Sequence, residues 1–341
     1  MGRKTPTASE QSGPLPPAVV EDRIVETRLM SWSAEQGPGS NATLTGRRGN
    51  GGFVIDTSVE GQWSPRHPSG DLPEIVDIID GVRRVDAHAM SNTVSGARAP
   101  ALFGSYAAGV VRCESGKARI LMDQEFLRLE RCYLQAGAAA EDLIVPLRPR
   151  ELRYRAIPVK DASKPSDLVR TLNNKMLAAE AALTSTLSAD PRTITLVDGP
   201  LRTQPAALRV AGYIKRTANW YLDPEERAIF DDLDVADLGP HVHPIASIMR
   251  LETWAAQPVE QAARLADELA LIMPRLAGSR LRDPRAPQNL TPVHGLEDKL
   301  RRLLGDRGWV RRRIAVALHE QNEQRGSGAT EGAESSPVVA Q

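Results

Sequence analysis

The chain has 341 residues, of which 41% are hydrophobic and 4% aromatic, so it is long enough for one large domain or two modest ones with a sizeable core. Its 43 basic residues balance 43 acidic residues, which argues against a protein that is basic overall but not against an enzyme that confines positive charge to one channel. The sequence has no apolar run of membrane-spanning or signal-peptide type, and Cys113 and Cys132 have no metal-ligand spacing. These features predict a cytoplasmic protein without membrane contact, zinc ribbon or disulfide framework.

The two ends of the chain are polar and rich in small residues. Residues 1–50 are predicted to be a flexible N-terminal arm, in which 19–34 can form a short helix. The glycines near residue 50 do not predict a phosphate-binding loop, because they precede a strand-like segment and lack the Gly-Lys-Ser/Thr ending. Residues 51–320 are predicted to form one domain, and residues 321–341 a disordered tail.

Between these ends the pattern is mixed α/β. Helices are predicted over 166–188, with Ser166 as N-cap, over 257–277 and over 294–320. The early strands lie close together in sequence and helices separate the later ones, which predicts an α/β domain around a mixed sheet. The strand candidates are residues 51–59, 75–81, 82–90, 106–114, 118–123, 193–199, 209–216 and 244–252.

Two of these strands end in Asp-Gly, at Asp80 and Asp198. An Asp-Gly after an apolar run is also a common hairpin signal, because both residues tolerate positive φ. A clean hairpin is disfavoured at the second motif, because Pro200 cannot donate to a following central ladder. Asp56 also ends an apolar run, but no glycine follows it, so Asp80 is the preferred first carboxylate.

A third carboxylate, Glu180, falls on the apolar face of the helix predicted over 166–188. It lies in a stripe with Leu168, Leu172, Met176, Leu183 and Leu187 at spacings of three and four. A lone buried carboxylate costs several kcal/mol unless it is paired or binds a metal. The alternatives are therefore an ion pair with an arginine and a metal site.

Taken together, Asp80, Glu180 and Asp198 suggest one site. Hard carboxylate oxygens are the ligands that Mg²⁺ and Mn²⁺ prefer. A pair of such ions can activate water and stabilise the leaving oxygen of a phosphodiester. The RNase H-like architecture builds its site in this way, with an acidic residue on a central strand and others on neighbouring elements.

The order of these motifs resembles the NurA nuclease family, which has an RNase H-like fold. The resemblance rests on "VDIIDGVRRVDAHA", "MLAAEAAL" and "TLVDGPLR", and on the later segments "AGYIKRTANWYLDPEE" and "RDPRAPQNLTPVHGLEDKLRRLLGD". It covers roughly residues 51–318.

The resemblance implies a manganese-dependent DNA nuclease that forms a homodimer and acts with HerA, a hexameric ATPase that translocates DNA. The processes implied are DNA end processing, repair or defence against phage. Asp80, Glu180 and Asp198 would be the acidic metal ligands.

Two residues from the C-terminal part could complete this site. The family closes its site with a histidine from a C-terminal helix, and His294 is the candidate here. Asp283 is the alternative fourth ligand, although Asp before Pro is equally a turn or helix-start residue.

Lys215 follows the second Asp-Gly on a predicted strand, where it would face the scissile phosphate or serve as an edge-strand lysine.

Three other functions remain open. An adaptor that only docks on the ATPase would have no reason to keep Glu180 on an apolar face. A metal-dependent phosphomonoesterase would need a closed pocket where a nuclease needs a channel. A zinc site at His241 and His243 lacks a third ligand with suggestive spacing.

Overall fold

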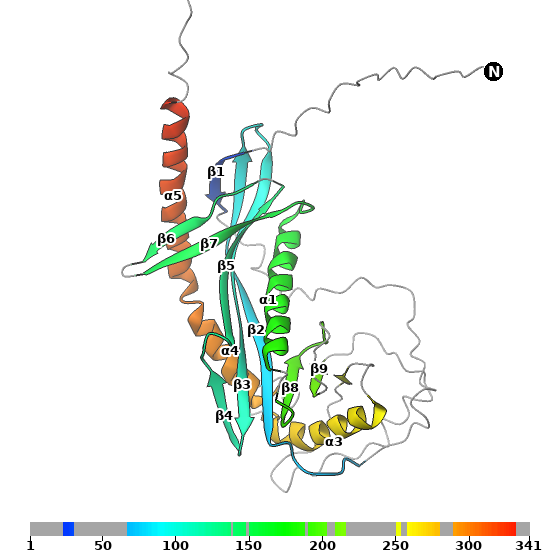
Figure 1. Ribbon diagram of the computed structural model, residues 1–341. Helices are drawn as coiled ribbons and strands as arrows, with labels where there is room; N and C mark the ends of the chain where they lie inside the picture. Colours follow the sequence, from blue (N-terminus) through cyan, green and yellow to red (C-terminus); the bar gives the residue numbers. More distant parts are fainter. Residues whose placement is uncertain are drawn as a thin grey trace, which may run out of the picture.

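Two long strands form the spine of the sheet, as the computed structural model in Figure 1 shows. β2 (Ile75–Thr93) and β3 (Arg98–Glu114) pair antiparallel from Ile75 opposite Glu114 to Asn92 opposite Arg98. The structure describes residues 23–30, 67–137, 139–147, 150–187, 190–202, 209–215, 250–253, 258–279 and 289–331.

In the described part of the chain the strands make one mixed sheet of ten, in the order β10-β9-β8-β2-β3-β5-β7-β6, with β1 beside β2 and β4 beside β3. β8 runs parallel to β2 and β9 parallel to β8, whereas β3 is antiparallel to its neighbours β2 and β5. The remaining strands are β1 (Ile24–Leu29), β4 (Lys117–Leu121), β5 (Leu127–Ala136), β6 (Leu143–Leu147), β7 (Arg150–Val159), β8 (Thr193–Asp198), β9 (Val210–Ile214) and β10 (Arg250–Glu252).

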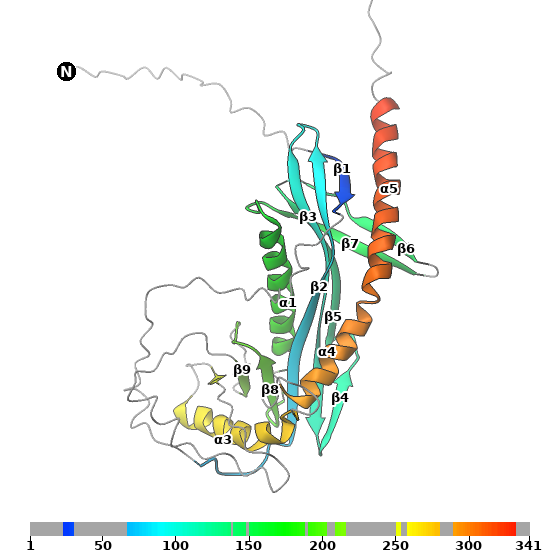
Figure 2. The same cartoon turned by 180° about the vertical axis from the view of Figure 1, so that it is seen from behind.

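Helices cover both faces of the sheet (Figures 1 and 2). α1 (Pro165–Leu187) packs on one face through Leu168, Leu172 and Leu183. α3 (Val259–Leu276), α4 (Thr291–Leu303) and α5 (Arg307–Glu331) pack on the opposite face. The protein is thus α/β with a helix-flanked mixed sheet, as predicted. No helix within the described ranges is long and apolar enough to cross a membrane.

The predicted N-terminal helix is wrong where it can be compared. Residues 24–29 form β1, which pairs antiparallel with the end of β2. The outer edge of β1 is occupied by the side-chain amide of Asn322 on α5, which accepts from Thr27 N at 3.1 Å and donates to Thr27 O at 2.9 Å. A residue 295 positions away therefore stabilises the strand, and β1 belongs to the sheet although it lies before the predicted domain boundary at residue 50.

Two predicted strands, 75–81 and 82–90, are one. β2 runs through Asp80 and Gly81 without a turn, because β3 pairs with it on both sides of the motif. Asp80 therefore lies in mid-strand, whereas Asp198 ends β8 as predicted. The predicted strand over 51–59 lies outside the described residues, as does 244–249 of the one that contains β10.

The helix predicted over 294–320 is two helices. α4 ends near Leu304, and Gly305 adopts a φ of +79°, a left-handed conformation that glycine enters without strain. α5 then continues to Glu331, so the predicted tail at 321–341 is helical over its first part. The N-cap prediction at α1 is also wrong, because the helix begins at Pro165 and Ser166 lies in its first turn. Asp167 in that turn accepts hydrogen bonds from the backbone N–H groups of Ser163 and Lys164, which precede the helix, each at 3.1 Å.

A buried carboxylate anchors the centre of the sheet. Asp86 sits at a register shift of β2 and is 1% exposed. It accepts hydrogen bonds from Arg84 Nε at 2.7 Å, from Tyr154 OH at 2.8 Å and from Ser105 Oγ. Because its oxygens are satisfied, the buried charge is compatible with a stable core.

The same cluster holds the end of α4. Arg84 donates to Leu304 O at 2.9 Å and to Gly305 O, and Arg131 donates to Leu304 O at 3.1 Å. The last carbonyls of a helix lack intrahelical donors and carry partial negative charge, so two guanidinium groups stabilise them. This contact fixes where α4 crosses the sheet.

We predict that Asp86→Ala lowers the free energy of unfolding by about 3–5 kcal/mol, because it leaves the Arg84 charge without its buried partner. Urea denaturation measures the change. Glu26→Ala breaks the pair with Arg28, whose side chain is 76% exposed, and is the control, with an expected change below about 1 kcal/mol. Equal effects of the two substitutions would contradict the anchoring role of Asp86.

Candidate active site

Asp80 and Asp198 lie at the same level on neighbouring strands. β2 and β8 pair in parallel from Ile75 opposite Thr193 to Ile79 opposite Val197, and each aspartate is the next residue along its strand. Side chains alternate between the faces of a sheet. Asp80 and Asp198 therefore share the face toward α4, to which Ile78 and Leu196 also point.

Glu180 approaches the same place from the opposite face. It is carried by α1 and is 4% exposed. Its Oε1 lies where a side chain at Gly81 would begin, and Met176 Cγ lies 2.9 Å from that point. Glycine at position 81 is thus required to admit the carboxylate of Glu180. The second residue of the first Asp-Gly motif makes room for the side chain of Glu180 and does not form a turn.

The three carboxylates affect one another electrostatically. Burial raises the pKa of Asp80 well above its usual value, and the charges of Asp198, Glu180 and Glu297 raise it further, while Lys215 lowers it. Burial, followed by the charge of Asp198, raises the pKa of Glu180 to about 8, against a smaller lowering by Arg202. Buried like charges favour either protons or a bound cation.

Lys215 lies inside this group of acids. Its ammonium donates to Asp198 Oδ2, and to Asn289 Oδ1 at 3.1 Å. Lys215 directly follows β9, whose Ala211 and Tyr213 point to the same face as Asp198. The sequence predicts that Lys215 lies near the acidic residues, and in the structure its ammonium pairs with Asp198.

His294 is not brought to these acids. Its side chain is 50% exposed, and its Nε2 lies 3.7 Å from Asp298 on the outer side of α4. Glu297 on the same helix is 9% exposed and faces inward. Sequence reasoning missed Glu297, although it interrupts the apolar stripe formed by Val293, Leu296 and Leu300. The other residues considered from the sequence, Asp283, Asp56, His241 and His243, lie outside the described residues.

The residues present fit a divalent metal in their chemistry. Asp80 Oδ2 is buried and has no hydrogen-bond partner in the described part of the chain, and carboxylate oxygens suit Mg²⁺ or Mn²⁺. With the side chains as they stand, the described ranges hold no group of three or more His, Cys, Asp or Glu residues arranged to grip one ion. Metal binding would therefore require Lys215 to leave Asp198 and the carboxylates to draw together.

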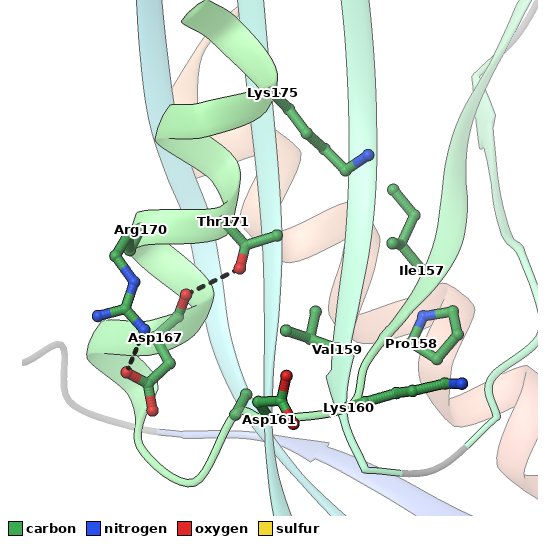
Figure 3. Close-up of a pocket in the computed structure, with 10 residues that line it drawn as sticks. Ile157, Pro158, Val159, Lys160, Asp161, Asp167, Arg170, Thr171 and Lys175 are labelled. Atoms are coloured by element: carbon green, nitrogen blue, oxygen red, sulfur yellow. Dashed lines mark hydrogen bonds and ion pairs between the residues drawn. The ribbon is translucent and has the colours of Figure 1, made fainter. Parts of the chain in front are cut away.

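A separate hollow of about 400 Å³ lies between α1 and the end of β7 (Figure 3). Ile157, Pro158 and Val159 line it from the β7 side and Thr171 and Lys175 from the α1 side, and Asp161 and Asp167 line it as well. Asp80, Glu180 and Asp198 do not line this hollow, so it is not the metal-binding candidate.

Neither the models of known protein families nor the curated proteins compared with the chain contain a match.

We predict that Gly81→Ala displaces Glu180, because the added Cβ would overlap Oε1 and press on Met176. A ligand that binds only the folded state raises the unfolding temperature. If Asp80, Glu180 and Asp198 bind Mn²⁺, the ion should raise the unfolding temperature of the wild type, and this rise should shrink or vanish in Gly81→Ala. Gly295→Ala, where nothing lies within 4 Å of the new Cβ, is the control. It should keep the Mn²⁺ response and gain about 0.5–1 kcal/mol, because alanine is the better helix former. An unchanged Mn²⁺ response in Gly81→Ala would contradict the placement of Glu180.

The raised pKa of Glu180 predicts a pH-dependent stability in metal-free protein. The folded state holds this proton up to a pKa of about 8, against 4.5 for an unperturbed glutamate. The stabilisation is thus complete below pH 4.5 and is lost as the pH rises toward 8, with a total of at most about 5 kcal/mol. Glu180→Gln should remove this part of the pH dependence. Thermal unfolding of both proteins in EDTA between pH 5 and 8.5 measures it; parallel curves would show that Glu180 ionises normally.

Proposed function

We propose that the protein is a metal-dependent DNA nuclease with an RNase H-like core. The observation that carries this proposal is that Asp80 and Asp198 lie at one level of neighbouring parallel strands, while Glu180 reaches Gly81 beside Asp80 and is electrostatically coupled to both. The position of Asp80 in mid-strand, beside a parallel strand that ends in Asp198, is consistent with an acidic centre of RNase H-like type. Structural anchoring alone would satisfy these carboxylates, as it does at Asp86, whereas Asp80 Oδ2 is left without a partner in the described residues.

The chain's own residues would divide the work between the two faces of the sheet. Asp80 and Asp198 would hold metal from the α4 face, and Glu180 from the α1 face. When bound, Mn²⁺ or Mg²⁺ would supply activation of water and stabilisation of the leaving oxygen of a phosphodiester. Lys215, released from Asp198, would be left with its charge beside the substrate phosphate, which a lysine binds as a point charge.

The remaining parts of the proposal come from the resemblance to NurA nucleases. They are a homodimer, a hexameric HerA-type ATPase as partner, and a place in DNA end processing, repair or defence in the cytoplasm. The second candidate is an adaptor subunit with weak or no activity. The Lys215–Asp198 pair favours that alternative, because a neutralised carboxylate is stable without metal.

The test is cleavage of end-labelled linear DNA with Mn²⁺, by wild type, Asp80→Asn, Glu180→Gln and Asp198→Asn, each with and without the ATPase. Every one of these substitutions removes a charged oxygen from the acidic centre. We expect each to lower the rate by roughly 100-fold or more. Asp161→Asn, an exposed carboxylate beside the hollow at β7, should cleave like wild type.

Each alternative function gives a different result in the same assay. Wild type that stays inert with Mn²⁺ and the ATPase indicates the adaptor. Hydrolysis of p-nitrophenyl phosphate without cleavage of DNA indicates a phosphomonoesterase. Cleavage that survives Asp80→Asn and Asp198→Asn would place the active centre elsewhere in the chain.

A further inference from the structure

α4 passes directly over the acidic centre. Gly109 stands opposite Asp80 in the β2–β3 pairing. A Cβ at Gly109 would lie 3.2 Å from Leu296 Cδ1 and 3.2 Å from Leu300 Cδ2. The missing side chain lets the helix approach the sheet closely at this level. The turn of α4 from Leu296 to Leu300 is therefore fixed against the strand that neighbours Asp80.

Glu297 belongs to that turn and is buried in it. Leu296 and Leu300 on either side are fully buried, and Glu297 itself is 9% exposed, whereas the side chain of Asp298 is 46% exposed. Burying a carboxylate on an apolar helix face is unfavourable unless a cation or donors compensate it. Arg301, one turn along, pairs with it: Arg301 Nη2 lies 3.0 Å from Glu297 Oε2.

Glu297 and Asp80 lie on the same side of the sheet. Ile78 and Val82, which flank Asp80 on its own face of β2, pack in one cluster with Leu296 and Leu300. Asp80 Oδ2, buried and without a hydrogen-bond partner in the described residues, is available to a ligand between the two elements. With Glu297 included, four carboxylates are available to two divalent cations, which take hard oxygen ligands.

Building on the proposed function, we propose that Glu297 is a fourth carboxylate ligand, and that α4 completes a two-ion centre for Mn²⁺ or Mg²⁺ through Glu297 and not through His294. Arg301 acts as a positioning residue: it holds the Glu297 carboxylate in place from one turn away. The helix cap at Leu304 O, held by Arg84 and Arg131, fixes the height of α4 over Asp80.

The test is Mn²⁺ binding to metal-free protein, with the free ion counted by electron paramagnetic resonance. The variants are Glu297→Gln, Asp298→Asn and His294→Gln. Wild type should bind two Mn²⁺ per chain. Glu297→Gln should lose one of them or weaken it by roughly 10–100-fold. Asp298→Asn, the neighbour on the same helix, and His294→Gln should bind as wild type does.

A fifth protein, Glu297→Asp, keeps the charge and shortens the side chain. It should also weaken the second ion, and it keeps the test decisive if Glu297→Gln folds poorly by circular dichroism. Normal binding of two ions by either folded Glu297 variant, or loss of an ion in His294→Gln, overturns the role of Glu297. Asp80→Asn separates the two proposals. If Asp80→Asn abolishes binding while Glu297→Gln does not, only the inference on Glu297 fails. If wild type binds no Mn²⁺, the proposed metal-dependent function fails with it.

Discussion

The parallel pairing of β8 with β2 is the constraint on which the candidate site depends. It sets Ile79 opposite Val197 and then stops, because β8 ends at Asp198 and Gly199 follows with a φ of +122°. β2 continues, and in the described residues it gains its next partner on that side only where β1 pairs, from Ala89 onward. Among the described residues no strand pairs with this edge of β2 between Asp80 and that point, and Glu180 approaches it at Gly81.

The same arrangement explains the electrostatics. A sheet centre covered by helices on both faces has little water to solvate charge, so burial and neighbouring carboxylates raise the pKa values of Asp80 and Glu180. Lys215 offsets part of this rise at Asp80. The contrast with Asp86 is informative. Both aspartates are buried in β2, but Asp86 has three donors around it and anchors α4, while the carboxylate of Asp80 keeps an oxygen without a donor in the described chain.

Much of this could be predicted from local sequence. The acidic residues on the apolar face of α1 and at the end of β8 were identifiable because each breaks a hydrophobic pattern, and Glu297 breaks one in the same way. What local sequence could not give was the partner of each strand. Asp80-Gly81 reads as a strand end until β3 is known to pair on both sides of it, and 24–29 reads as helical until β2 and Asn322 are placed beside it. β5 and β7 were not among the predicted strands, because charged residues alternate along them. Their exposed faces tolerate arginine and glutamate.

The most direct measurement is the anomalous scattering of manganese in crystals of the wild-type protein grown with Mn²⁺. If the carboxylates form a metal centre, the anomalous peaks lie among Asp80, Asp198 and Glu180, and the Lys215 ammonium has moved off Asp198. If the manganese peaks lie elsewhere, or if Lys215 still contacts Asp198 at saturating Mn²⁺, these carboxylates do not hold metal and the nuclease proposal loses its basis.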